Sequence, residues 1–175
     1  ILVLDSGLPR ALAGSAYNRR RQECEEACLA LGVTSLRDVS HPGEVERLAE
    51  PLRRRARHVV SENARVLRAA SGVSASELGA LMSASHASLR DDYEVSVPLL
   101  DRLVDRLQKE ARVFGARLTG AGFGGCTVNL VRADAIDAFA RDVIAPYRQR
   151  TGLPAVMYVT EACDGLRNLT PNPSP

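Results

Sequence analysis

The sequence has few aromatic residues and none of the cysteine patterns that mark metal sites or disulfide frameworks. Phe, Trp and Tyr make up 4% of the 175 residues, Trp is absent, and the net charge is +2. Bases of single-stranded nucleic acid stack on aromatic side chains, and nucleic-acid-binding domains carry basic patches. The 4 cysteines and 3 histidines are scattered, without a C-x-x-C pair. We therefore expect no metal site, no disulfide framework and no nucleic-acid partner.

Long apolar runs are also missing. Every apolar run is far shorter than the roughly 18 residues of a membrane-spanning helix, so we expect no membrane partner. Free cysteines without a disulfide pattern are typical of a reducing compartment, and we expect a cytoplasmic location. The chain begins with ILVLDSG, an apolar strand without Met or lead-in, which leads us to expect a piece of a longer protein.

Hydrophobic periodicity predicts helices and strands in turn. Alternating apolar residues predict strands over 1–4, 113–119, 126–131 and 155–160. Helices are predicted over 15–31, 44–49, 51–72 and 133–149, with two more that begin after Ser74 and at Pro98. This order predicts an α+β fold in which helices pack on one face of a mainly antiparallel sheet. Residues 1–163 form one domain, and the polar, proline-rich stretch 164–175 is predicted to be a disordered tail.

Local sequence patterns predict where some of these helices begin and which of their faces are buried. Ser15 is predicted to cap the first helix, and Ser74 with Glu77 has the spacing of a capping box. The apolar stripe of the 51–72 helix runs from Leu52 through Val66 and Leu67. The run RRRAR at 53–57 is expected to be a solvated helix face.

Residues 117–131, RLTGAGFGGCTVNLV, hold the most unusual composition in the chain. Gly120, Gly122 and Gly125 match the dinucleotide pattern G-x-G-x-x-G, but a predicted strand follows where that motif needs a helix. The Walker pattern fails as well, because Cys126 stands in place of its lysine. Two interpretations stay open: a hairpin loop that needs positive φ, or a loop that lets another backbone or a phosphate come close.

Other chemistry-bearing residues have simple structural explanations. Asp91 and Asp92 are adjacent, and neighbours on a helix point about 100° apart, so we expect a solvated pair at a helix end. His86 lacks a nucleophile elbow nearby and is expected to be a hydrogen-bonded packing histidine. Tyr17 lies on the inward stripe of its helix and is either a core or a cleft-lining residue. The residues alone form no complete catalytic constellation.

Several segments read together resemble a known family. Residues 5–25, 57–66, 81–104 and 115–131 are similar to the C-terminal half of the galactokinases, which belong to the GHMP kinase superfamily. TGAGFGG is shared across the superfamily, whereas GSAYNRRR and SHASLRDDYEVS are typical of galactokinases. The resemblance runs from Ile1 to about Val159.

The resemblance implies a ferredoxin-like GHMP kinase C-terminal domain packed against an N-terminal domain. It implies Mg²⁺- and ATP-dependent phosphorylation of galactose at its anomeric hydroxyl, giving galactose 1-phosphate. Tyr17 matches the tyrosine whose hydroxyl contacts the sugar. The loop that supports the phosphate-binding loop of the N-terminal domain matches Thr119, Gly120, Ala121, Gly122, Phe123, Gly124 and Gly125.

The resemblance also shows which parts of the family are missing. The phosphate loop, the magnesium-binding carboxylate, the catalytic aspartate and a GEHTDY-type sugar segment would lie upstream of Ile1. We therefore expect no catalytic residue, no metal ligand and no kinase activity in this chain alone. Two alternatives stay open: a kinase for a related sugar such as N-acetylgalactosamine, and a non-catalytic sensor that binds galactose and ATP. The weak charge and scarce aromatic residues argue against a third, a ferredoxin-like RNA-binding module.

Overall fold

The structure is a computed structural model that describes residues 1–9 and 13–163, so the predicted tail at 164–175 lies outside the described residues. One sheet has the strand order β2-β3-β1-β4, and every neighbouring pair is antiparallel. This confirms the predicted antiparallel sheet. The strands are β1 (Leu2–Asp5), β2 (Val113–Thr119), β3 (Cys126–Val131) and β4 (Val156–Val159).

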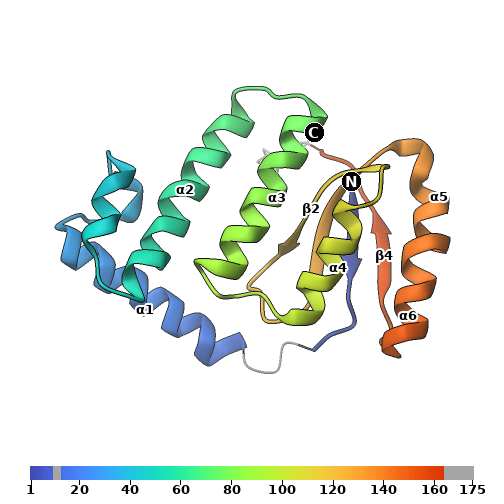
Figure 1. Cartoon of the computed structure of the whole chain (residues 1–175), viewed down its shortest axis with the longest axis horizontal. Coiled ribbons are helices and arrows are strands. Elements are labelled where there is room, and N and C mark those ends of the chain that lie inside the picture. The colour runs from blue at the N-terminus through green and yellow to red at the C-terminus, as the bar shows by residue number, and fades with distance from the viewer. Residues whose placement is uncertain (10–12, 164–175) are drawn as a thin grey trace, which may run out of the picture.

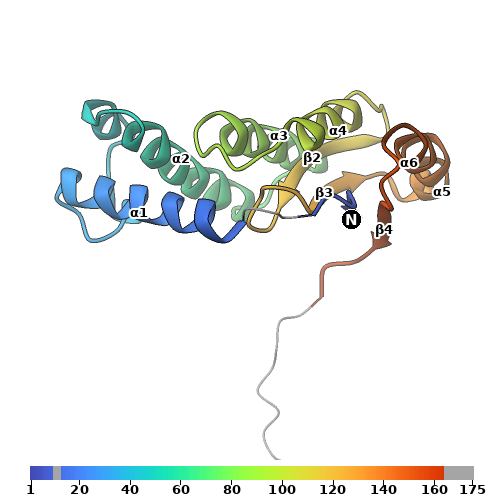
Figure 2. The ribbon, with the colours of Figure 1, turned by 90° about the horizontal axis from the view of Figure 1, so that it is seen from below.

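Helices cover one side of the sheet and extend beyond it. Figure 2 shows α3, α4, α5 and α6 above the sheet, with α1 and α2 in a helical layer past the β2 edge. The chain therefore has the α+β layering that the order of its elements predicts. None of the helices in the described parts is long and apolar enough to cross a membrane. The helices are α1 (Ala13–Leu31), α2 (Leu52–Ala70), α3 (Ala75–Asp91), α4 (Pro98–Gln108), α5 (Ile136–Phe139) and α6 (Ala145–Thr151).

The hydrophobic core has two parts. In the larger part, Leu2 and Leu4 of β1 pack with the α4 residues Leu100, Val104 and Leu107, and all five are fully buried. Their spacing of two on the strand, and of three and four on the helix, puts each set on one face. The smaller part lies among α1, α2 and the 3₁₀ turns between them, and contains Ala27, Leu31, Leu36, Val45, Leu48, Ala56 and Val60.

Several helix boundaries differ from the sequence prediction. Helix α1 begins at Ala13, so Ser15 lies within the helix and its predicted capping position was wrong. Ser74 does cap α3, since its Oγ accepts the Glu77 N–H at 3.2 Å. The reciprocal half of the capping box is replaced by a salt bridge from the Glu77 carboxylate to Arg68. The short helix predicted over 44–49 is instead a 3₁₀ helix that spans Pro42–Arg47.

The long helix predicted over 133–149 is interrupted. A 3₁₀ turn (Ala133–Ala135) leads into α5, and a π-helical segment (Ala140–Ile144) separates α5 from α6. Pro146 lies in the first turn of α6 and has no N–H for the regular i→i−4 hydrogen bond. We attribute the local change of helix type to this missing donor.

The outer edge of β2 is covered by α3, as Figure 1 shows. The Leu118 N–H on this edge donates to His86 Nδ1 at 3.3 Å. Gly79 and Gly115 let the two backbones touch, because a Cβ built on Gly115 would lie 2.5 Å from the Gly79 Cα. A helix packed along a strand edge keeps that edge from pairing with another chain.

Candidate functional site

The glycine loop, residues 119–125, joins β2 to β3, which form an antiparallel pair. This confirms the predicted strand–loop–strand arrangement and excludes a helix after the glycines. The loop has an unusual density of left-handed backbone, which glycine adopts at low cost. Positive φ angles occur at Gly120, Gly122, Phe123, Gly124 and Gly125.

Two other backbones approach the loop closely, and both belong to this chain. A Cβ on Gly122 would overlap the Val95 carbonyl oxygen, to which the Phe123 N–H donates at 2.7 Å. A Cβ on Gly124 would lie 2.9 Å from the Leu8 carbonyl oxygen. The loop therefore meets both interpretations left open by the sequence: it is a hairpin loop with positive φ, and it accepts close backbone contact.

Ser6 anchors the end of the loop, and the sequence analysis did not identify it as a site residue. It is fully buried, and both its N–H and its hydroxyl donate to the Gly125 carbonyl, at 3.0 and 2.6 Å. Its own carbonyl accepts the Tyr147 hydroxyl at 3.0 Å. The only signal in the sequence is the DSG turn, in which the Gly7 N–H donates to Asp5 Oδ1 at 2.9 Å.

Tyr17 lies near the start of α1 and is 53% exposed, so of the two positions that the sequence left open it does not occupy the core. The inward stripe of α1 becomes buried only farther along the helix, at Ala27 and Leu31. Tyr17 instead lines a cavity of about 360 Å³ that also contains Cys24 and Tyr93. Figures 1 and 2 both place the β2–β3 loop beside the N-terminal end of α1. The two predicted site elements therefore lie at the same end of the molecule.

Tyr93, which lines this cavity, is partly buried and stacks on the buried His58. The rings of His58 and Tyr93 stack with centroids 4.5 Å apart, and His58 Nδ1 lies 3.0 Å from the Ser88 hydroxyl. Burial lowers the pKa of His58 to about 4 and raises the pKa of Tyr93. Both side chains are therefore neutral at pH 7, and the charged residues that line the cavity are Arg21 and Glu25 of α1.

Arg55 corrects the prediction that residues 53–57 form a solvated face. Its side chain is 2% exposed, and it donates to Glu23 at 2.7 Å and to Glu94 at 2.6 Å. It also donates to the Asp92 carbonyl at 2.5 Å. Burial opposes ionisation of Glu23, but hydrogen bonds and charge from Arg55 and Arg20 outweigh it and lower the pKa of that carboxyl. Arg55 thus joins α1 and α2 to the connection that carries Val95.

Asp91 and His86 have the structural roles expected of them, whereas Asp92 is not solvated as predicted, because its side chain is only 20% exposed. Asp91 forms a salt bridge with Arg90 at 2.7 Å, whereas Asp92 accepts from the Ser88 hydroxyl at 2.9 Å, so the two carboxylates occupy separate environments. His86 is 2% exposed and accepts the Leu118 N–H, which confirms a hydrogen-bonded packing histidine. Burial lowers its pKa.

The apolar stripe predicted for α2 is too long. Val66 and Leu67 are 58% and 72% exposed, respectively, because the smaller core ends at Val60. Both residues therefore lie outside any core or site of the described chain.

Comparison with known proteins places the chain in a family. The family model for the C-terminal domain of GHMP kinases matches residues 67–149. Over the whole chain, 48% of residues are identical to a galactokinase of Roseiflexus sp., and over 95% of it, 42% are identical to a galactokinase of Haemophilus influenzae. These alignments cover 48% and 46% of the two relatives, so the chain spans about half their length.

A solved structure agrees with the sequence comparison. The crystal structure of Lactococcus lactis galactokinase complexed with galactose matches 90% of this chain with a TM-score of 0.81 and 40% identity. The match covers 43% of that chain. The chain therefore belongs to the GHMP kinases, with the fold of their C-terminal domain and similarity to galactokinases over its whole length.

Proposed function

We propose that this chain is the C-terminal part of a galactokinase, which transfers a phosphoryl group from ATP to the anomeric hydroxyl of galactose and forms galactose 1-phosphate. The observation that carries the proposal is 40% identity to a galactokinase solved with galactose, over 90% of the chain. Within this enzyme the chain contributes binding and positioning. Phosphoryl transfer depends mainly on both, together with charge stabilisation.

Tyr17 is proposed to bind the sugar. Its side chain is exposed at the end of α1 that adjoins the glycine loop, so its hydroxyl is free to meet a ligand. Residues 119–125 are proposed to support the phosphate-binding loop of an N-terminal domain. Hydrogen bonds from Ser6 and to Val95 give this glycine loop a fixed shape against which a second loop can rest.

The catalytic aspartate and the ligands of Mg²⁺ are proposed to lie in the N-terminal domain. Among the described residues no group of three or more His, Cys, Asp or Glu side chains could hold a metal ion. The residues of the described ranges 1–9 and 13–163 therefore do not fit a magnesium site.

The first test compares the complete protein with this chain alone. The complete protein should phosphorylate galactose faster than N-acetylgalactosamine, and residues 1–175 alone should give no turnover above a reaction without protein. A preference for N-acetylgalactosamine would change the assigned sugar. Galactose-dependent capture of a regulatory protein without turnover would favour the sensor alternative, and turnover by the chain alone would disprove the proposed division of roles.

Replacing Tyr17 with Phe should weaken galactose binding in the complete enzyme. Loss of one hydrogen bond to the sugar is expected to raise the galactose KM by about five- to tenfold and to leave the ATP KM unchanged. Tyr158→Phe is a matched control, because Tyr158 is 55% exposed on β4. An unaltered galactose KM for Tyr17→Phe, or an equal increase for Tyr158→Phe, would argue against a sugar contact.

Replacing Gly124 with Val should disturb the nucleotide site. Gly124 has a φ of +125° and lies against Leu8 and Pro9, so a branched side chain would strain the loop and displace its neighbours. We expect the ATP KM to rise at least about tenfold, since the glycine loop would no longer hold its shape. Gly43→Val is the control, because no atom lies within 4 Å of a Cβ built there. An unchanged ATP KM for a folded Gly124→Val enzyme would refute the supporting role.

A further inference from the structure

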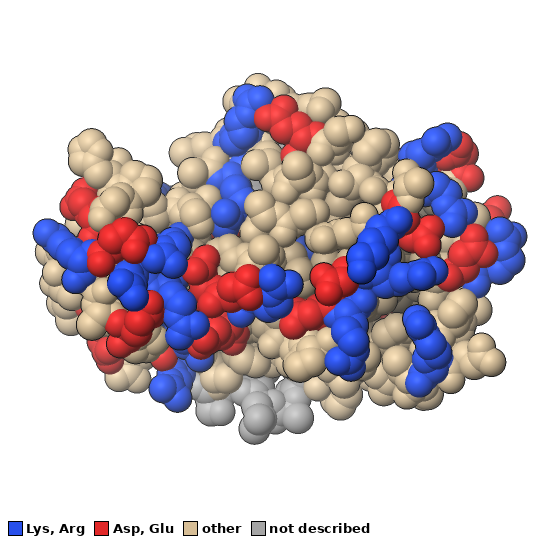
Figure 3. Space-filling model, in the orientation of Figure 1, with Lys and Arg blue, Asp and Glu red and all other residues tan. Residues whose placement is uncertain are grey.

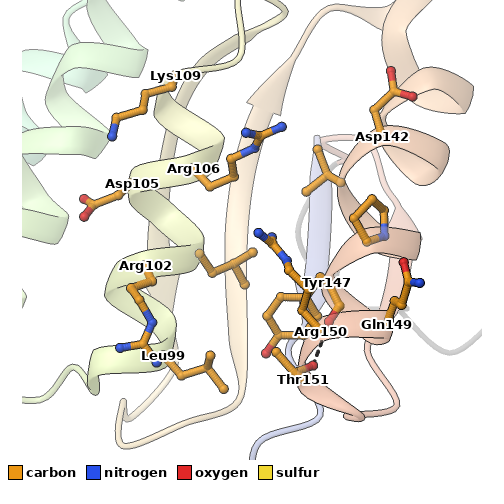
Figure 4. Close-up of a pocket in the computed structure, with 13 residues that line it drawn as sticks. Leu99, Arg102, Asp105, Arg106, Lys109, Asp142, Tyr147, Gln149, Arg150 and Thr151 are labelled. Atoms are coloured by element: carbon orange, nitrogen blue, oxygen red, sulfur yellow. Dashed lines mark hydrogen bonds between the residues drawn. The ribbon is translucent and has the colours of Figure 1, made fainter.

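A groove between α4 and α6 is separate from the proposed kinase site. Its volume is about 760 Å³, within the range of roughly 300–1,000 Å³ that is common for small-molecule pockets. Tyr17 and the glycine loop do not line it. The apolar part of its lining, which we call the floor, includes Leu99, Val143 and Pro146. Charged side chains extend from both helices around the groove (Figure 4). The groove thus combines an apolar surface with charge, as a site for an amphiphilic small molecule would.

Positive charge without a protein partner is concentrated here. Within residues 1–9 and 13–163, the basic side chains that have neither an ion pair nor a hydrogen bond are Arg37, Arg102, Lys109 and Arg150. The last three line the groove, where Arg106 adds a fourth cation. Figure 3 shows basic side chains gathered over α4 and α6. Like charges held close together repel, so this arrangement is suited to a bound anion.

The acidic residues of the groove do not cancel this charge. Asp142 already accepts from Arg112 at 3.2 Å and from Arg141 at 3.0 Å. Asp105 points away from the space between the helices in Figure 4. The same figure shows Arg106 and Arg150 pointing into that space from opposite sides. Arg106 also pairs with Glu110 at 3.4 Å, so an anion between α4 and α6 would meet one unpaired guanidinium group, that of Arg150, and one ion-paired guanidinium group, that of Arg106.

A guanidinium group matches a phosphate better than it matches a simple halide, because its planar N–H fork donates to two phosphate oxygens. From these observations we propose that the α4–α6 groove binds a small phosphate ester. Arg106 and Arg150 hold the phosphate, and the organic part rests on the apolar floor. Lys109, like Asp105, points away from the space between the helices in Figure 4 and adds only to the positive charge of this face. Tyr147, which is 4% exposed and bonded to Ser6, gives the groove a rigid wall.

The test is an NMR titration of this chain with two probes, phenyl phosphate and inorganic phosphate. Both carry the same head group, and only the first has an apolar part. Phenyl phosphate should shift the amide signals of α4 and α6 saturably and bind at least about threefold more tightly, because it also covers the floor. Added NaCl should weaken the binding of both probes, since Arg106 and Arg150 are solvent-exposed.

Two double substitutions test whether the anion binds to specific arginine side chains or is attracted only by the net positive charge. Arg106→Gln with Arg150→Gln should raise the Kd for phenyl phosphate at least about tenfold, because charge-assisted hydrogen bonds are lost. Arg37→Gln with Arg68→Gln is the matched control, since it also removes one unpaired and one ion-paired arginine. The control should change the Kd less than about twofold.

Three results would overturn the proposal. The first is an absence of saturable shifts with either probe. The second is equal weakening by the two pairs of substitutions, which would show that only net charge matters. The third is a response of the groove signals to anionic lipid vesicles but not to phenyl phosphate, which would make this face a membrane-binding surface instead.

Discussion

Gly79→Ala is expected to lower the free energy of unfolding of this chain by more than about 3 kcal/mol, because overpacking at a rigid contact cannot relax. A Cβ at Gly79 would overlap the carbonyl group of Phe114 and lie 2.9 Å from the Gly115 nitrogen. These are backbone atoms of β2, which is hydrogen-bonded to β3 on its other side. The helix would have to move away from the strand, and the Leu118–His86 hydrogen bond would be lost with it.

The measurement is urea denaturation of the parent and the variant, with Gly14→Ala as the matched control. Gly14 is also a helical glycine, but no atom lies within 4 Å of a Cβ built there. Ala has a higher helix propensity than Gly, so this control should raise stability by about 0.5–1 kcal/mol. A loss of stability for Gly79→Ala together with a gain for Gly14→Ala would show that the loss comes from the α3–β2 contact. Equal stability of Gly79→Ala and the parent would contradict it.

Arg55→Met is expected to lower the free energy of unfolding at pH 7 by about 3–5 kcal/mol. The substitution breaks a buried ion pair and leaves one of its charges buried. The remaining charge is Glu23, whose side chain is 8% exposed and would keep only exposed Arg19 and part-buried Arg20. The neighbouring Arg54→Met is the control, because Arg54 is 34% exposed. Its salt bridges are screened by solvent, so the control should cost less than about 1 kcal/mol.

At acid pH, the difference in the free energy of unfolding between Arg55→Met and the parent should become smaller. The pKa of Glu23 in the folded parent lies below its ordinary value of 4.5, so Glu23 contributes stability above that pH and loses it as the pH falls through the lowered pKa. Without Arg55, the two largest effects that lower this pKa are lost, so the pKa of the Glu23 carboxyl is higher in the variant than in the parent. The variant therefore gains a proton first, which removes the buried charge. Urea denaturation of both proteins between pH 7 and 3 measures this difference in the free energy of unfolding. A difference that stays constant with pH would contradict the role of Glu23.

Local patterns in the sequence were sufficient for much of the fold. Strands 113–119 and 126–131 are observed with the bounds that alternation predicts, and along 126–131 every second residue is buried. The glycine loop between them, the Ser74 cap and the start of α4 at Pro98 also follow from short-range chemistry. The family followed from motifs, since TGAGFGG and GSAYNRRR are local as well.

Long-range contacts decided the rest. Nothing within RRRAR distinguishes Arg55 from Arg54, because the carboxylates of Glu23 and Glu94 that bury it lie 32 and 39 residues away. The helical stripe placed Tyr17 inward, but a stripe is buried only where another element covers it, and α1 extends past its cover. Gly79 and Gly115 are ordinary in the sequence and become critical only because α3 and β2 meet there. The sequence by itself determined the elements, whereas the tertiary structure determined which residues of each element are enclosed, since burial depends on partners distant in the chain.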